Sequence, residues 1–218
     1  MMSAPLDNLP TEAPILSLEE LQARAAASLE SGKRNFRDLL AAEPWLSNLK
    51  DEALRIPKEH ASARSKYAKL RALADRIHAA MTPYAACKRS CSHCCHRSVP
   101  ISAHEAAILS EVSGRQLANV KRASGPRTVA DDVPTTACPF LVEGACSIYE
   151  HRPIACRIKF NLSDDDFYCD PALAPEGSVP PAMNMDVFLM AYAQIFEKQP
   201  LSDIRSFFSA SDEASPAG

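Results

Sequence analysis

The stretch that decides the fold is Cys87-Lys88-Arg89-Ser90-Cys91-Ser92-His93-Cys94-Cys95, which places four cysteines within nine residues. No cysteine precedes this stretch, and four follow it, at Cys138, Cys146, Cys156 and Cys169. Eight thiolates are enough for two tetrahedral all-cysteine sites, or for one iron–sulfur cluster with a spare site. We therefore expect all eight cysteines to be metal ligands around which the chain folds.

The adjacent pair Cys94-Cys95 limits how the thiolates can share ions. Side chains of neighbouring residues diverge, so these two sulfurs do not easily serve one ion in the same way. We infer that they serve different ions or that one of them bridges two. A helix after Pro83 would place Cys87 and Cys91 on one face with Cys94 or Cys95, and in a loop the thiolates can also converge.

An even number of cysteines also permits a disulfide framework. However, residues 1–7 lack the basic start and apolar run of a signal peptide, and no stretch approaches the roughly 20 apolar residues that cross a membrane. We therefore expect a cytoplasmic protein without a membrane partner. In a reducing compartment, closely spaced cysteines ligate metal or do redox chemistry more often than they form disulfides.

Composition sets further limits on function. The chain has 218 residues, of which 46% are hydrophobic, so it can bury a core without relying on metal alone. The net charge of −3 gives no general attraction to nucleic acid or acidic lipid. No long basic face interleaved with aromatic residues is present, so we do not expect nucleic-acid binding, and no protein partner can be named.

Helical periodicity surrounds the cysteines, which predicts a mainly α fold with short extended segments. Ser17-Leu18-Glu19-Glu20 has the form of a capping box, and we expect its helix to end at Ser31-Gly32, with a short second helix over residues 35–42. After Pro57 we expect an amphipathic helix of about 25 residues. The predicted organisation is a disordered lead-in (1–16), a helical N-terminal extension (17–57), a cysteine-cluster metal-binding domain (58–210) and a mobile tail (211–218).

The C-terminal part of the chain adds helices and one acidic loop. Residues 183–196 carry an apolar stripe that we expect to pack against the long helix before the cysteines, and a last short helix is expected from Leu201. Asp164-Asp165-Asp166 is expected to be a solvated loop. Residues 113–137 are expected to form a polar connection with one helical turn near residues 116–121.

A helix with a clear start lies between the two cysteine groups. Val99-Pro100-Ile101 predicts a short extended segment, and Ser102-Ala103-His104-Glu105 predicts a capping box for a helix that ends before Gly114. Helix capping by itself accounts for a glutamate at position 105. The sequence leaves open whether Glu105 or His104 instead completes a metal shell.

The second cysteine group reads Cys138-Pro139-Phe140-Leu141-Val142-Glu143-Gly144-Ala145-Cys146-Ser147-Ile148-Tyr149-Glu150-His151-Arg152-Pro153-Ile154-Ala155-Cys156-Arg157. Together with the upstream Cys-x3-Cys-x2-Cys-Cys run, it resembles the CxxCxxCC family of zinc- or iron-chelating domains, also called YkgJ-type cysteine-cluster proteins. The matching parts are the Cys-Cys pair, the extended exit into a Ser-x-x-Glu helix, Cys-Pro-Phe-Leu, Cys-Ser-Ile-Tyr-Glu, Arg-Pro and Cys-Arg, over about residues 87–160. The chain departs from the pattern in having three residues between Cys87 and Cys91, and Cys169 lies outside its strongest part.

The residues of the second group also have a physical reading. Gly144 permits a turn that holds Cys138 and Cys146 together, and the residues around Arg152-Pro153 start a short helix that returns Cys156 to the centre. Apolar side chains can exclude water from the site; these are Phe140, Leu141, Ile148 and Tyr149. Nearby cations offset thiolate charge; these are Lys88, Arg89, Arg97, Arg152, Arg157 and Lys159.

The resemblance implies a protein that binds zinc or iron, including iron in a [4Fe–4S] cluster. Two other classes stay open: an iron–sulfur oxidoreductase or methyltransferase-type enzyme, because related clusters carry such labels, and a metal-stapled protein-interaction module. The spacing Cys87-x3-Cys91-x2-Cys94 also matches radical S-adenosylmethionine enzymes, but no run of alternating strands and helices follows it. No catalytic residue can be named from the sequence.

Overall fold

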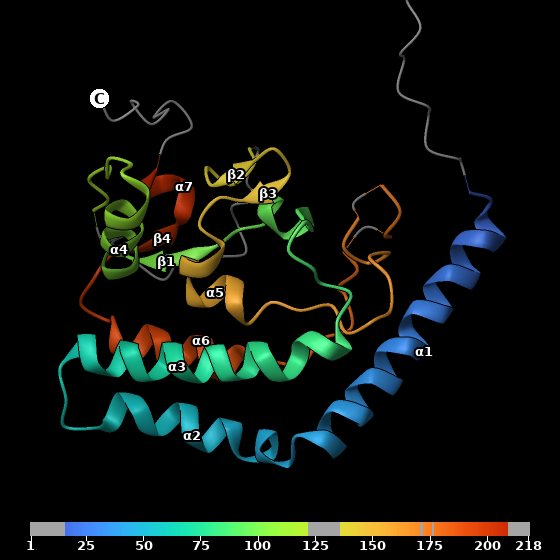
Figure 1. Cartoon of the computed structure of the whole chain (residues 1–218), viewed down its shortest axis with the longest axis horizontal. Coiled ribbons are helices and arrows are strands. Elements are labelled where there is room, and N and C mark those ends of the chain that lie inside the picture. The colour runs from blue at the N-terminus through green and yellow to red at the C-terminus, as the bar shows by residue number, and fades with distance from the viewer. Residues whose placement is uncertain (1–15, 122–135, 171, 176, 209–218) are drawn as a thin grey trace, which may run out of the picture.

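The computed structural model describes residues 16–121, 136–170, 172–175 and 177–208 (Figure 1). This part of the chain is mainly helical with short strands, which confirms the predicted fold class. Residues 1–15 of the expected lead-in and all of the expected tail lie outside it. The helices are α1 (Leu18–Ala42), α2 (Leu49–Arg55), α3 (Ala63–Met81), α4 (Ala103–Ser113), α5 (Ile154–Arg157), α6 (Asp186–Ile195) and α7 (Ile204–Phe207). The strands are β1 (Pro100–Ser102), β2 (Leu141–Val142), β3 (Ala145–Cys146) and β4 (Leu201–Asp203), and the 3₁₀ helices are η1 (Pro44–Asn48), η2 (Ile56–Lys58), η3 (Thr82–Tyr84), η4 (His93–His96) and η5 (Tyr149–His151).

Helix α1 is continuous where two helices were predicted. Its capping box is confirmed, because the Ser17 hydroxyl accepts from the Glu20 N–H and the Glu20 carboxylate accepts from the Ser17 N–H. Gly32 does not end the helix, so that prediction was wrong. A Cβ at Gly32 would lie 2.4 Å from Pro181 Cβ, so glycine serves here to let another segment approach the helix closely.

Helices α2, α3 and α6 form a packed helical layer (Figure 1). The apolar stripe predicted for α3 is buried, but the helix begins at Ala63 and is shorter than expected. Helix α6 contacts both α2 and α3, which confirms that the C-terminal stripe packs against the long helix before the cysteines. The first hydrophobic cluster joins these helices to α1, to α5 and to the segment after α5. Its buried side chains include Leu39, Leu70, Ile77, Ile154, Phe160 and Phe188.

A second hydrophobic cluster lies beside α4, α7 and two small antiparallel sheets. The expected extended segment before α4 is confirmed as β1, which pairs with β4 with Ile101 opposite Ser202. Residues 201–203 were predicted as helix and are instead β4, because the Asp203 carboxylate caps α7 at the Arg205 N–H and accepts from the Val99 N–H. The cluster consists of Val99, Ile101, Ala106, Leu109, Phe140, Ile148, Ile204, Phe207 and Phe208.

The two turns that glycines were expected to make are present. Gly114 ends α4 with φ 71°, in the left-handed region that favours glycine. Glu143 and Gly144 connect β2 to β3 with φ values of 49° and 76°, as a tight hairpin turn of the I′ kind requires. The helical turn expected near residues 116–121 is absent from these described residues, where the Ala118 N–H donates to the Phe207 carbonyl instead. None of the described helices is long and apolar enough to cross a membrane.

Candidate metal centre

Seven of the eight cysteines line one cavity of about 260 Å³, which we call the cysteine cavity. Its walls come from both hydrophobic clusters, with Phe160 from the first and Phe140 and Ile148 from the second. All eight cysteines are free thiols. The cysteines lining the cavity are Cys87, Cys91, Cys94, Cys95, Cys138, Cys146 and Cys156.

The first cysteine run reaches the cavity through irregular backbone rather than one helix. After η3 the chain is non-helical until η4, which carries Cys94 and Cys95. The backbone of Cys95 is held from two sides, because its carbonyl accepts from the Cys138 N–H at 2.8 Å and from the Arg205 guanidinium at 2.6 Å. The Cys87 sulfur accepts from the Asn161 N–H at 3.3 Å. Of the two geometries left open by the spacing, the loop is the one observed.

The second cysteine group reaches the cavity from three short elements. Cys138 precedes β2, Cys146 lies in β3 opposite Leu141, and Cys156 lies on α5, which starts after Pro153 as expected. All three cysteines pack against the second hydrophobic cluster. The hairpin and the short helix therefore bring together thiols that are distant in sequence.

Cys169 is the one cysteine that does not line the cavity. Burial, with the charges of Cys87 and Cys91 acting in the same direction, raises the pKa of its thiol to about 11. The Asn161 N–H donates to the Cys87 sulfur and the Asn161 side chain donates to the Asp165 carbonyl, so the loop that carries Cys169 meets the Cys87 side of the cavity. Phe167, two residues before Cys169, is fully buried and anchors this loop.

The cavity disfavours free thiolates. Burial raises the pKa of Cys138 to about 11 and that of Cys156 well above its ordinary value. Cys94 is the exception: its contact with the Cys95 thiol lowers the pKa of Cys94, and the charges of Lys159 and Arg152 act in the same direction against burial. A bound cation would supply the charge that the other buried thiolates lack.

Four of the six expected cations line the cavity; they are Lys88, Arg89, Arg152 and Lys159. Arg152 stacks on the Tyr149 ring at 3.8 Å and lies 3.2 Å from His78 Nε2. Arg157 instead pairs with Asp75 outside the cavity lining. The cations are therefore concentrated where thiolate charge would collect.

Glu105 and His104 do not line the cavity. Glu105 is 1% exposed, and its carboxylate accepts from the Ile154 N–H at 2.9 Å and from the Tyr67 hydroxyl at 3.1 Å, with a further short bond to the Tyr192 hydroxyl. The His104 ring stacks on Phe196. The expected capping box is thus half formed, because Ser102 caps the Glu105 N–H while the carboxylate holds the start of α5, which carries Cys156.

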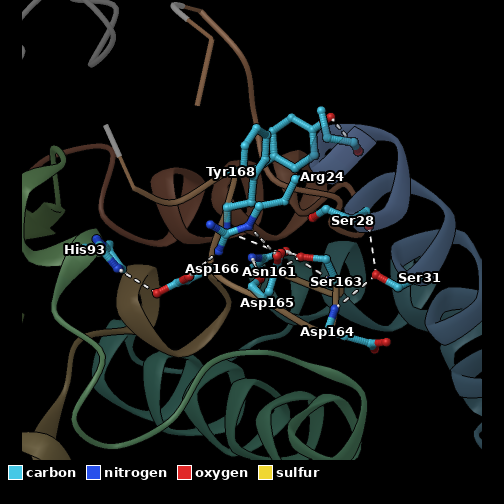
Figure 2. A network of polar contacts seen from close by, with 12 residues as sticks. Arg24, Ser28, Ser31, His93, Asn161, Ser163, Asp164, Asp165, Asp166 and Tyr168 are labelled. Carbon is cyan, nitrogen blue, oxygen red and sulfur yellow. Dashed lines mark hydrogen bonds and ion pairs between the residues drawn. The ribbon is translucent and has the colours of Figure 1, made fainter. Parts of the chain in front are cut away.

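The acidic run at residues 164–166 was expected to be solvated, and Asp164 and Asp166 are exposed as expected, but the run also makes ion pairs with other segments. Figure 2 shows that it connects α1 to the cysteine run. Asp165 pairs with Arg24 at 3.1 Å, and Asp166 lies 3.2 Å from His93 Nε2. Nothing local in the sequence connects Arg24 on α1 with an acidic run more than a hundred residues away.

In the part of the chain that the structure describes, no group of three or more His, Cys, Asp or Glu side chains stands in a geometry that could hold a metal ion. The cysteine cavity therefore gathers thiols without closing a coordination shell around one point. The donor set is nevertheless the one that zinc and iron–sulfur clusters use, which is cysteine sulfur. The cysteines of the cavity therefore supply the donor atoms that zinc or an iron–sulfur cluster requires.

Comparison with known proteins adds one match. Residues 86–172 match the model of the CxxCxxCC family, described as a "putative zinc- or iron-chelating domain". The matched range contains all eight cysteines, including Cys169, whereas α1 and α6 lie outside it. Neither a curated protein nor a solved structure matches the chain. The match covers the same region in which the sequence resembles this family.

Proposed function

We propose that this protein binds zinc or iron through its eight cysteine thiolates. The observation that supports this most strongly is the meeting of seven thiols around one cavity, from segments that are separated in sequence by the whole of α4 and the residues after it. Buried thiols gathered in this way are costly to ionise unless a cation is bound among them. Metal binding is the function that accounts for both the grouping and the burial.

We further propose that the thiolates act as two groups of four. Cys95 belongs with Cys138, Cys146 and Cys156, because its backbone is bonded to Cys138 and these three thiols pack on the second hydrophobic cluster. Cys94 belongs with the remaining three, which are Cys87, Cys91 and Cys169. The adjacent Cys94 and Cys95 then serve different ions, which is one of the two arrangements that the sequence left open.

The second group of ligands is supported by the contacts of one asparagine. The Asn161 backbone N–H donates to the Cys87 sulfur, and the Asn161 side chain donates to the Asp165 carbonyl in the loop that carries Cys169. Asn161 thereby connects a thiol of the first run with the loop of the last one. Seven thiolates cannot complete two four-cysteine sites, so Cys169 is needed as the eighth.

Bound zinc would act as a structural ion, because four thiolates leave it no open position. A [4Fe–4S] cluster held by thiolates would instead transfer electrons. Both require reduced thiols, so we place the protein in the cytoplasm.

The test is elemental analysis of the full chain purified without oxygen, together with its visible absorption. We expect stoichiometric zinc without colour, or iron with the brown absorption of an iron–sulfur cluster. Cys91→Ser and Cys156→Ser should each lower the metal content, since each removes a ligand from a different group, whereas Ser92→Ala should not. Full metal content in both cysteine variants, or none in the unaltered protein, would reject the proposal.

A further inference from the structure

The loop of residues 161–170, which we call the Cys169 loop, is ordered by its own hydrogen bonds. The Asn161 side chain donates to the Asp165 carbonyl at 2.7 Å, and the Ser163 hydroxyl donates to the Asn161 side-chain oxygen at 2.6 Å. The Cys169 N–H donates to the Asp166 carbonyl at 2.7 Å. The loop therefore has one defined shape. Because Cys169 is part of it, any segment that packs against the loop also determines where Cys169 lies.

Helix α1 binds one side of this loop (Figure 2). Arg24 pairs with Asp165 at 3.1 Å and lies 3.7 Å from Asp166. The Ser31 hydroxyl accepts from the Asp164 N–H at 3.1 Å. The Asn35 amide donates to both the Leu162 carbonyl and the Asp164 carboxylate at 2.8 Å. Helix α1 thus binds both backbone groups and carboxylates of the loop. The backbone contacts fix the position of the loop, and the contacts to the carboxylates offset its negative charge.

The other side of the loop faces the first cysteine run. Asp166, which contacts Arg24, also lies 3.2 Å from Nε2 of His93, a residue between Cys91 and Cys94. The Asn161 N–H donates to the Cys87 sulfur. The loop is therefore held between α1 and the thiols with which we have grouped Cys169.

We propose that α1 is a positioning element for the metal centre, with Arg24 as its principal residue, and that it holds the Cys169 loop against the Cys87, Cys91 and Cys94 thiols. This inference rests on the proposed function and concerns one of its two ligand groups. Helix α1 lies outside the matched residues 86–172, so this chain supplies a support for its eighth thiol from beyond the domain itself. Removing that support loosens the Cys169 group and leaves the Cys138, Cys146 and Cys156 group unchanged.

The test compares Arg24→Ala with Arg37→Ala, which removes an exposed arginine from the same helix. The full chain, reduced and metal-free, is treated with iodoacetamide, and the alkylation rate of each cysteine is measured by mass spectrometry of its peptides. We expect Arg24→Ala to raise the rate at Cys169 by about threefold to fivefold, as the loss of a partly exposed ion-pair network implies, and to leave Cys156 unchanged. Arg37→Ala should behave as the unaltered protein.

A uniform rate increase at all cysteines, or none at Cys169, would overturn the inference. If the arginine variant fails to fold, Asn35→Ala tests the same docking through its bonds to the Leu162 carbonyl and Asp164, with the same outcomes expected. In metal-loaded protein, Arg24→Ala should also release part of the metal to a chelator faster. Unaltered protein that binds no metal would reject the proposed function, while the alkylation rates would still decide the role of α1.

Discussion

Replacing Glu105 by alanine tests how the fold holds the helix that carries Cys156. The carboxylate is 1% exposed and serves three donors, which are the Ile154 N–H and the hydroxyls of Tyr67 and Tyr192. Glu105→Ala leaves these groups without their acceptor inside the core. A buried donor without a partner costs about 1–3 kcal/mol, and the variant also creates a small cavity.

From these contributions we expect Glu105→Ala to lower the free energy of unfolding by about 3–5 kcal/mol, near the upper end for single substitutions. In a chain of this size the melting temperature should fall by about 6–20 °C. The assay is thermal and denaturant unfolding of the reduced, metal-free protein, followed by circular dichroism. Glu111→Ala is the matched control, because Glu111 is exposed on the same helix. An effect of Glu105→Ala within about 0.5 kcal/mol of that control would refute the reasoning.

The pH dependence gives a second signature of Glu105. Burial raises its pKa above the ordinary value of 4.5, although hydrogen bonds from Tyr192, Ile154 and Tyr67 oppose the shift. Below pH 4.5 the Glu105 carboxyl is protonated in both the folded and the unfolded protein. Above pH 4.5 it ionises first in the unfolded chain, so the contribution of Glu105 to stability falls as pH rises towards its pKa in the folded protein. Glu105→Gln cannot ionise. The stability advantage of the unaltered protein over Glu105→Gln should therefore shrink as pH rises from 4.5, and an advantage that grows would contradict this sign.

Two further changes test other parts of the fold. Gly32→Ala should destabilise the protein by about 1–2 kcal/mol in denaturant unfolding. The reason is that overpacking against Pro181 outweighs the roughly 1 kcal/mol that alanine contributes to a helix. A stabilised variant would show that Pro181 moves away freely. Burial alone would raise the pKa of Asp203, but N–H groups of Arg205 and Val99 and the Arg205 guanidinium hold it below the ordinary 3.8. Asp203→Asn should therefore lower the free energy of unfolding by about 1–3 kcal/mol at neutral pH. This loss should diminish as pH falls below 3.8, because a carboxylate with a lowered pKa contributes stability only while it is ionised. A loss that does not change with pH would argue against the ionised contact.

Local chemistry made several elements predictable from the sequence. Ser17 and Ser102 begin helices because their hydroxyls accept from the N–H three residues on. Gly114 and Gly144 mark turns that need positive φ. The cysteine spacing and the Cys138 to Cys156 segment indicated the family, whose model matches the same region. Each of these signals is contained within a few neighbouring residues.

The features that could not be predicted depend on contacts between distant segments. Gly32 looked like a helix end, but its role is set by Pro181, and Leu201 begins a strand only because β1 lies beside it. Asp165 looked solvated because its partner Arg24 lies on a helix far away in sequence. Glu105 looked like half of a capping box, yet its acceptor atoms serve groups on α3, α5 and α6. Periodicity and capping patterns contain no information about such pairings.

The central claim, that cysteine thiolates bind zinc or iron, is tested most directly by native mass spectrometry of the full chain purified without oxygen. The mass excess over the metal-free chain identifies the metal and its number, and the protons missing from that mass report how many thiols have ionised. We predict a chain carrying two zinc ions or one iron–sulfur cluster, with the corresponding loss of thiol protons. A spectrum that shows only the metal-free chain with all eight thiols protonated would contradict the account.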